Sequence, residues 1–128
     1  MKLSEYIQLD GIAIAELIRN KEVKKEEIID LSFKQLERVQ DLNAVTETRR
    51  EKVYEESKTT EGPLAGVPIF LKDLSQSIKG DRSTGGARLF AQSFANVTAN
   101  FVKKLQETGT SILGYSTTPE FGLKNITE

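Results

Sequence analysis

The chain has 128 residues, the length of one domain, and its 18 basic and 19 acidic residues give a formal charge of −1. No strong overall field is available to attract nucleic acid or an anionic membrane surface. The absence of cysteine and histidine excludes thiolate nucleophiles, disulfides, a Ser-His-Asp triad and most zinc sites. Proton transfer therefore depends on lysine, carboxylate or tyrosine side chains.

The distribution of apolar residues indicates a protein that stays in the cytoplasm. No apolar run approaches the roughly 20 residues that a membrane span needs, and the first residues lack the apolar stretch of a secretory signal. We expect neither membranes nor nucleic acid as partners. Most charged residues fall in residues 1–61, whereas eight of the nine glycines lie in residues 62–128. This contrast predicts one domain with a helical first part and an α/β second part.

Three helices are expected in the first part. Asp10 is a suitable N-cap for a helix that ends near residues 19–21, with Ile14, Leu17 and Ile18 on one face. A second helix has Glu26 and Glu27 in its first turn, where acidic groups are favoured. Its apolar positions are Ile28, Leu31, Phe33, Leu36 and Val39. The other elements expected here are a break at 41–43, a strand at 44–46 and a helix at 49–57.

The second part predicts a strand, a helix and a further strand joined by a parallel crossover. Residues 67–71 form a continuous apolar run, typical of a strand buried on both faces, with Pro68 at its beginning or on a sheet edge. Residues 111–115 indicate the second strand. The helix between them has Gly109 at its end. We expect Asn96 or Thr98 to cap it and Phe101, Val102 and Leu105 to form its apolar face.

Lys72 is the residue that most needs an explanation, because it follows directly on five apolar residues. One interpretation is that its ammonium group extends into solvent, where it forms a weak pair with Asp73. The other is that the fold desolvates the amine, so that its neutral form accepts a proton during catalysis. The local sequence leaves both interpretations open.

Two blocks of this sequence resemble the amidase signature family. Residues 62–73 (GPLAGVPIFLKD) are similar to the family segment GPLxGVPxxxKD. Residues 99–114 resemble the stretch ATxVxxLxxAGAxxxGK, and residues 117–121 resemble TNxPEF. The resemblance extends over essentially the whole chain. It implies an α/β fold, namely the N-terminal part of the amidase signature fold, with helices packed on part of a mixed β-sheet.

The resemblance also implies a chemistry that suits a chain without histidine or cysteine. In the family, a triad of serine, a serine in a cis peptide linkage and lysine hydrolyses carboxylic amides without a cofactor or metal. The motif assigns the lysine to Lys72. Both serines belong to a Gly/Ser-rich segment that follows the PEF block and does not occur in these 128 residues. We therefore expect this chain alone to be inactive and the complete enzyme to act on small-molecule amides.

Several alternatives stay open at this point. The family includes general amidases, 6-aminohexanoate-cyclic-dimer hydrolases and the transamidating component of tRNA-dependent amidotransferases. The chain has Tyr115 and Thr118 where the family usually has lysine and asparagine, which favours an amidase over the amidotransferase component. Another class of function is a non-catalytic module for interaction or dimerisation. An apolar strand edge exposed in the isolated chain would favour association, and a homodimer is one such assembly.

Three further features of the sequence carry weaker signals. Asn125 lies in the loop that borders the acyl pocket in family members, so it is a candidate substrate contact, although an ordinary loop asparagine is the simpler interpretation. Gly80 and Gly85 have phosphate-loop spacing, but the required Lys-Ser/Thr does not follow them. Asp73 and Asp81 lack a third ligand for a metal, and we expect Asp73 to orient either the backbone or Lys72.

Overall fold

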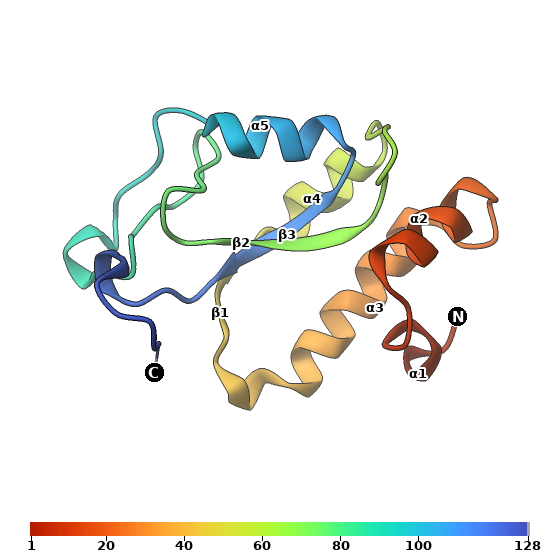
Figure 1. Ribbon diagram of the computed structural model, residues 1–128, viewed down its shortest axis with the longest axis horizontal. Coiled ribbons are helices and arrows are strands. Elements are labelled where there is room, and N and C mark those ends of the chain that lie inside the picture. Colours follow the sequence, from red (N-terminus) through yellow and green to blue (C-terminus); the bar gives the residue numbers. More distant parts are fainter. Residues whose placement is uncertain (128) are drawn as a thin grey trace.

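The computed structural model describes residues 1–127 and contains a three-stranded sheet with helices around it (Figure 1). The helices and strands, in chain order, are α1 (Leu3–Tyr6), α2 (Gly11–Arg19), α3 (Lys25–Arg38), β1 (Val45–Thr48), α4 (Arg50–Ser57), β2 (Pro68–Lys72), α5 (Asn100–Glu107) and β3 (Ser111–Ser116). Three short 3-10 helices lie at Gln40–Leu42, Arg88–Phe90 and Glu120–Gly122. Among the described helices, none is both long and apolar enough to cross a membrane.

The sheet is mixed, as the resemblance implied, and β3 is its central strand. The strand order is β1-β3-β2, with β2 parallel and β1 antiparallel to β3. The parallel pair is connected through α5, which confirms the expected crossover (Figure 1). Because β1 comes from the first part of the chain and β2 and β3 from the second, one sheet joins both parts. Glycine at position 114 permits the close approach of β1 and β3, because a Cβ atom there would lie 2.1 Å from the carbonyl oxygen of Glu47.

Separate clusters of side chains fill the core. Ile112 of β3 and Leu71 of β2 pack with Val102 of α5. Leu113, the next residue of β3, packs with Phe33 of α3 and with Val53 of α4. Since successive residues of a strand point to opposite faces, α5 covers one face of the sheet and α3 and α4 cover the other. A third cluster joins α2 to the start of α3, with the buried residues Ile14, Ala15, Val23, Ile28 and Val67.

The prediction that the apolar run at 67–71 is buried on both faces is wrong for part of the strand. Leu71 is buried, but Ile69 and Phe70 are only half-buried. The reason is that β2 lies at an edge of the described sheet, whereas β3, with β2 and β1 on its two sides, is buried from Ser111 to Tyr115. Pro68 is the first residue of β2, as expected from its missing N–H group.

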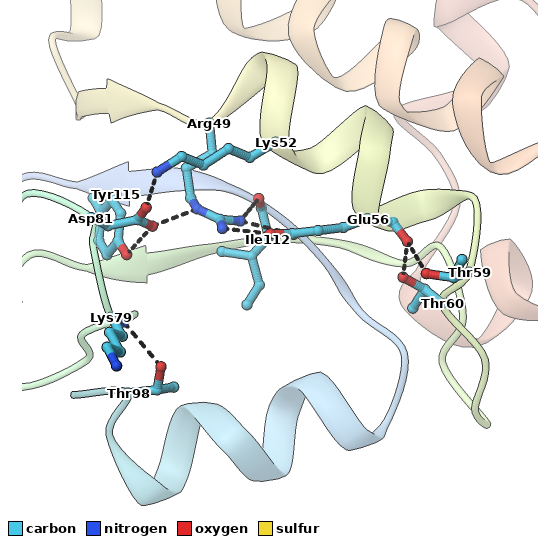
Figure 2. Close-up of polar contacts among 10 residues, drawn as sticks. All are labelled: Arg49, Lys52, Glu56, Thr59, Thr60, Lys79, Asp81, Thr98, Ile112 and Tyr115. Carbon is cyan, nitrogen blue, oxygen red and sulfur yellow. Dashed lines mark hydrogen bonds and ion pairs between the residues drawn. The ribbon is translucent and has the colours of Figure 1, made fainter.

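The first residues of α2 and α5 show whether the predicted N-caps are present. Asp10 caps α2, since its carboxylate accepts a hydrogen bond from the Ala13 N–H at 2.8 Å. The cap predicted for α5 is wrong, because Ala99 stands at the N-cap position without a side-chain bond. The Thr98 hydroxyl instead accepts the backbone N–H of Lys79 at 3.0 Å (Figure 2). Phe101 is also 58% exposed, so it does not belong to the buried face of α5.

Candidate active site

Lys72 is the last residue of β2 and its side chain is exposed. Its backbone is paired in register with Ser116, the last residue of β3. Immediately afterwards the chain turns, with Ser75 in the left-handed region at a φ of +61°. The side-chain oxygen of Gln76 accepts the Lys72 backbone N–H at 2.8 Å. The ammonium group forms no salt bridge within residues 1–127. The strand and the turn therefore fix the backbone of Lys72 and leave its amine accessible.

Asp73 is only 4% exposed and does not pair with Lys72. Its carboxylate accepts the backbone N–H of Thr84 at 3.0 Å and also accepts the Thr84 hydroxyl. Its own N–H donates to the carbonyl oxygen of Ser116 at 3.2 Å. Of the two sequence-based interpretations of Asp73, the contacts support the one in which it orients the backbone. The weak pair with Lys72 that the sequence suggested is not formed.

Loops gather at the carboxyl ends of β2 and β3. The Thr84 hydroxyl accepts the Gly86 N–H at 3.1 Å, and the Phe121 N–H donates to the Gly85 carbonyl oxygen at 2.8 Å. A Cβ atom on Gly86 would lie 2.6 Å from the carbonyl oxygen of Thr118, so glycine permits this close approach. Figure 1 shows the segment after β2 and the C-terminal segment at the same end of the molecule. Ligands of open α/β sheets commonly bind outside the carboxyl ends of parallel strands, which makes this end the candidate site.

A pocket of about 350 Å³ lies beyond the end of β3. Its lining combines apolar side chains with polar ones, namely Gly86, Thr118, Pro119, Glu120, Leu123, Lys124, Ile126 and Thr127. Asn125 belongs to the same loop and is exposed. Its role as a substrate contact stays a prediction, because its neighbours rather than Asn125 itself line this pocket.

A second group of polar side chains, called here the Asp81 cluster, consists of Arg49, Lys52, Glu56, Asp81 and Tyr115 (Figure 2). Asp81 is 5% exposed, and its carboxylate accepts hydrogen bonds from Arg49 Nε at 2.6 Å, Tyr115 Oη at 2.8 Å and Lys52 Nζ. Arg49 also donates to both oxygens of Glu56, at 2.7 and 3.1 Å, and to the Ile112 carbonyl oxygen at 3.1 Å. The cluster therefore joins α4, β3 and the segment between β2 and α5.

The charges of the Asp81 cluster hold one another in their ionised forms. Burial by itself would raise the pKa of Asp81, but the donors Lys52, Tyr115 and Arg49 outweigh it and hold the pKa below its usual value. Burial would lower the pKa of Arg49, yet the carboxylates of Glu56 and Asp81 raise it. Burial and the hydrogen bond to Asp81 raise the pKa of Tyr115. Tyr115 thus supplies a neutral donor to the Asp81 carboxylate.

A pocket of about 230 Å³ lies against the Asp81 cluster, and most of the charged side chains that line it are already paired. Arg49 and Lys52 bind Asp81, and Arg82 pairs with Glu47 at 3.4 Å. Sequence reasoning missed this cluster, since its members lie far apart along the chain. The signal that was available is Asp81 itself, a carboxylate in a glycine-containing loop, whose pairing with Asp73 suggested only a carboxylate pair or a metal site.

Comparison with known proteins assigns the family. The family model described as Amidase matches residues 23–128. The chain belongs to the amidase family. It is 37% identical over 129 residues to a lipoamidase of Enterococcus faecalis and 35% identical over 122 residues to a 6-aminohexanoate-cyclic-dimer hydrolase of Paenarthrobacter ureafaciens. These alignments include 98% and 93% of this chain.

Solved structures confirm the fold class. A 6-aminohexanoate cyclic dimer hydrolase complexed with its substrate superposes with a TM-score of 0.89 and 35% identity, over 94% of this chain and 26% of that one. The chain also spans only 18% and 25% of the length of the lipoamidase and of the cyclic-dimer hydrolase. What is shared is therefore one section of the amidase fold, and these relatives are hydrolases of carbon–nitrogen bonds by name.

Proposed function

We propose that the complete protein hydrolyses carboxylic amides and that Lys72 is the base of its catalytic triad. The observation that carries this proposal is the position of Lys72 in the family motif and in the fold. Lys72 is the last residue but one of the segment GPLAGVPIFLKD. It lies exposed at the carboxyl end of a parallel strand, where loops converge. A lysine at this position can reach a hydroxyl group that packs against this end of the sheet.

In the proposed mechanism, the Lys72 amine accepts a proton from a middle serine, and that serine in turn accepts the proton of the nucleophilic serine. The nucleophilic oxygen forms a bond to the amide carbonyl carbon, and the carbon–nitrogen bond breaks as the departing amine takes up the proton. Water then hydrolyses the resulting ester and releases the acid. Neither serine belongs to these 128 residues, so Lys72 is the contribution of this chain.

The proposed substrates are small linear or cyclic amides. This class rests on the names of the relatives, an amidase and a hydrolase of the cyclic dimer of 6-aminohexanoate. The pocket beyond β3 supports it, because Leu123, Ile126 and Pro119 provide apolar surface next to the polar groups of Thr118 and Lys124. Such a lining suits an acyl chain that ends in an amide.

The test is an assay of the protein made from its complete open reading frame, with the cyclic 6-aminohexanoate dimer and a chromogenic anilide as substrates. We expect turnover by the wild type and a loss of about 100- to 10,000-fold for Lys72→Met, the range for removal of a general base. Lys79→Met is the matched control, since Lys79 is also exposed but lies in the following loop. It should keep wild-type turnover.

Two outcomes would contradict the proposal. One is a Lys72→Met variant as active as the wild type, and the other is a complete protein that hydrolyses neither substrate nor any other amide in a screen. The 128-residue chain by itself should show no turnover, because it contains no Gly/Ser-rich segment after the PEF block. Turnover by this chain that survives Lys72→Met would contradict the assignment of the triad.

A further inference from the structure

The backbone of Lys72 is held by more hydrogen bonds than an exposed side chain requires. For a surface lysine at a strand end, the hydrogen bonds of the strand itself are sufficient. Here the next residue, Asp73, places a buried carboxylate directly beside it, and that carboxylate has no cationic partner within residues 1–127. Burying a charge without a cation is costly unless hydrogen bonds replace its water, so the bonds that Asp73 does make require an explanation.

Both donors to the Asp73 carboxylate come from one residue, Thr84. The backbone N–H and the hydroxyl of Thr84 bind the two different carboxylate oxygens, and the same hydroxyl accepts the Gly86 N–H. A carboxylate that accepts two donors from one residue is fixed in orientation as well as in position. Asp73 is therefore locked to the loop at 84–86, eleven residues further along the chain.

The loop that carries Thr84 is itself fastened to the sheet. Residues 73–99 contain one short 3-10 helix and otherwise no regular element. Asp81, three residues before Thr84, is held by Arg49, Lys52 and Tyr115 in the Asp81 cluster. The Thr84 donors are thus presented from a segment that the cluster attaches to α4 and β3.

We infer that Asp73 and Thr84 are positioning residues for Lys72. The Asp73 carboxylate, locked by Thr84, and the Asp73 N–H, bound to Ser116, together set the backbone from which the lysine extends. The Gln76 side chain fixes the N–H of Lys72 itself from the other side of the turn. This inference rests on the proposed function of Lys72, and it assigns to the Asp73–Thr84 pair the task of aiming that amine.

The test uses the complete protein with three variants. Thr84→Val keeps the shape and the backbone N–H but removes the hydroxyl, Thr84→Ser restores the hydroxyl, and Asp73→Asn keeps the shape but removes the charge. We expect Thr84→Val and Asp73→Asn to lower kcat about 10- to 100-fold with KM unchanged, as for partners that orient a reacting group. Thr84→Ser, which keeps a hydroxyl at this position, should have the kcat of the wild type. Backbone hydrogen exchange, followed by mass spectrometry, should quicken in the peptide around residues 70–76 in Thr84→Val and not in Thr84→Ser.

The outcomes separate this inference from the proposed function. If Lys72→Met is inactive while Thr84→Val and Asp73→Asn keep wild-type kcat, the positioning role is wrong and the function of Lys72 stands. If Lys72→Met is fully active, the proposed function is wrong. A Thr84→Ser variant as impaired as Thr84→Val would also overturn the inference, because restoring the hydroxyl would then be irrelevant. The midpoint of thermal unfolding of each variant identifies any loss that comes from unfolding alone.

Discussion

The Asp81 cluster and the turn at residues 72–76, called here the Lys72 turn, differ in how their charged groups are paired. In the cluster, the buried Asp81 carboxylate has three donors, and Arg49 donates hydrogen bonds to two carboxylates and a carbonyl oxygen. At the turn, the Lys72 ammonium is exposed and without a salt bridge among the described residues, although a carboxylate follows it in sequence. The charged groups of the Asp81 cluster are therefore paired with one another and stabilise the fold. The charged group proposed for catalysis, the Lys72 ammonium, is left unpaired within residues 1–127.

The largest stability effect should follow from removing the centre of the cluster. Asp81→Ala leaves Arg49 buried with one of its two carboxylate partners missing, and breaking a buried ion pair costs about 3 to 5 kcal/mol. The free energy of unfolding from urea denaturation should fall by this amount. Glu55→Gln is the control, because the Lys58–Glu55 pair is exposed on both sides and such pairs contribute less than about 1 kcal/mol. Equal losses in the two variants would show that the cluster does not stabilise the fold.

Acid should weaken the Asp81 cluster. The pKa of Asp81 is lower in the folded chain than in the unfolded chain, so the unfolded chain binds the proton first as the pH falls. The contribution of Asp81 to stability is therefore present above its unfolded pKa of about 4 and is lost as the pH falls through the folded value. Urea denaturation of wild type and Asp81→Asn from pH 7 to pH 3 should show the difference between them shrinking. A difference that stays constant would contradict a charged Asp81.

The part of the fold that the sequence predicted depends on local signals. Asp10 before an amphipathic run predicted α2, and the apolar runs around Gly109 predicted the β2–α5–β3 crossover. The wrong predictions concern residues whose burial depends on which other elements pack against them. Ile69 and Phe70 are half-buried because β2 lies at the edge of the described sheet, which its own residues do not show. Phe101 is exposed because α5 packs through the neighbouring Val102, about 100° further round the helix.

The candidate site was predictable to the extent that it follows a motif. The apolar run at 67–71 placed Lys72 at a strand end, and the structure has it there. The Asp73–Thr84 bonds join residues eleven apart across an irregular loop, and the Asp81 cluster joins residues 49, 81 and 115. Such contacts depend on how the chain folds back on itself. No local spacing in the sequence indicates them.

A smaller effect is expected at the edge of the cluster. Tyr115→Phe removes the donor to Asp81 and keeps the aromatic packing of a side chain that is 3% exposed. Because Arg49 and Lys52 still bind the Asp81 carboxylate, the loss should be that of one hydrogen bond to a charged group, about 1.5 to 3 kcal/mol. Urea denaturation measures it. A loss as large as that of Asp81→Ala would mean that Tyr115, and not the ion pairs, holds the segment.

The smallest effect on stability should come from the residue with the largest effect on catalysis. Lys72→Met replaces an exposed side chain with one of similar length, and the restraints on its backbone come from Gln76 and from the Asp73 N–H bond to Ser116, which the substitution leaves in place. The free energy of unfolding should therefore stay within about 0.5 kcal/mol of wild type, as for surface substitutions in general. Urea denaturation of the variant beside Asp81→Ala provides the contrast. A marked loss in Lys72→Met would show that the lysine stabilises the fold, and its loss of turnover would then no longer separate chemistry from folding.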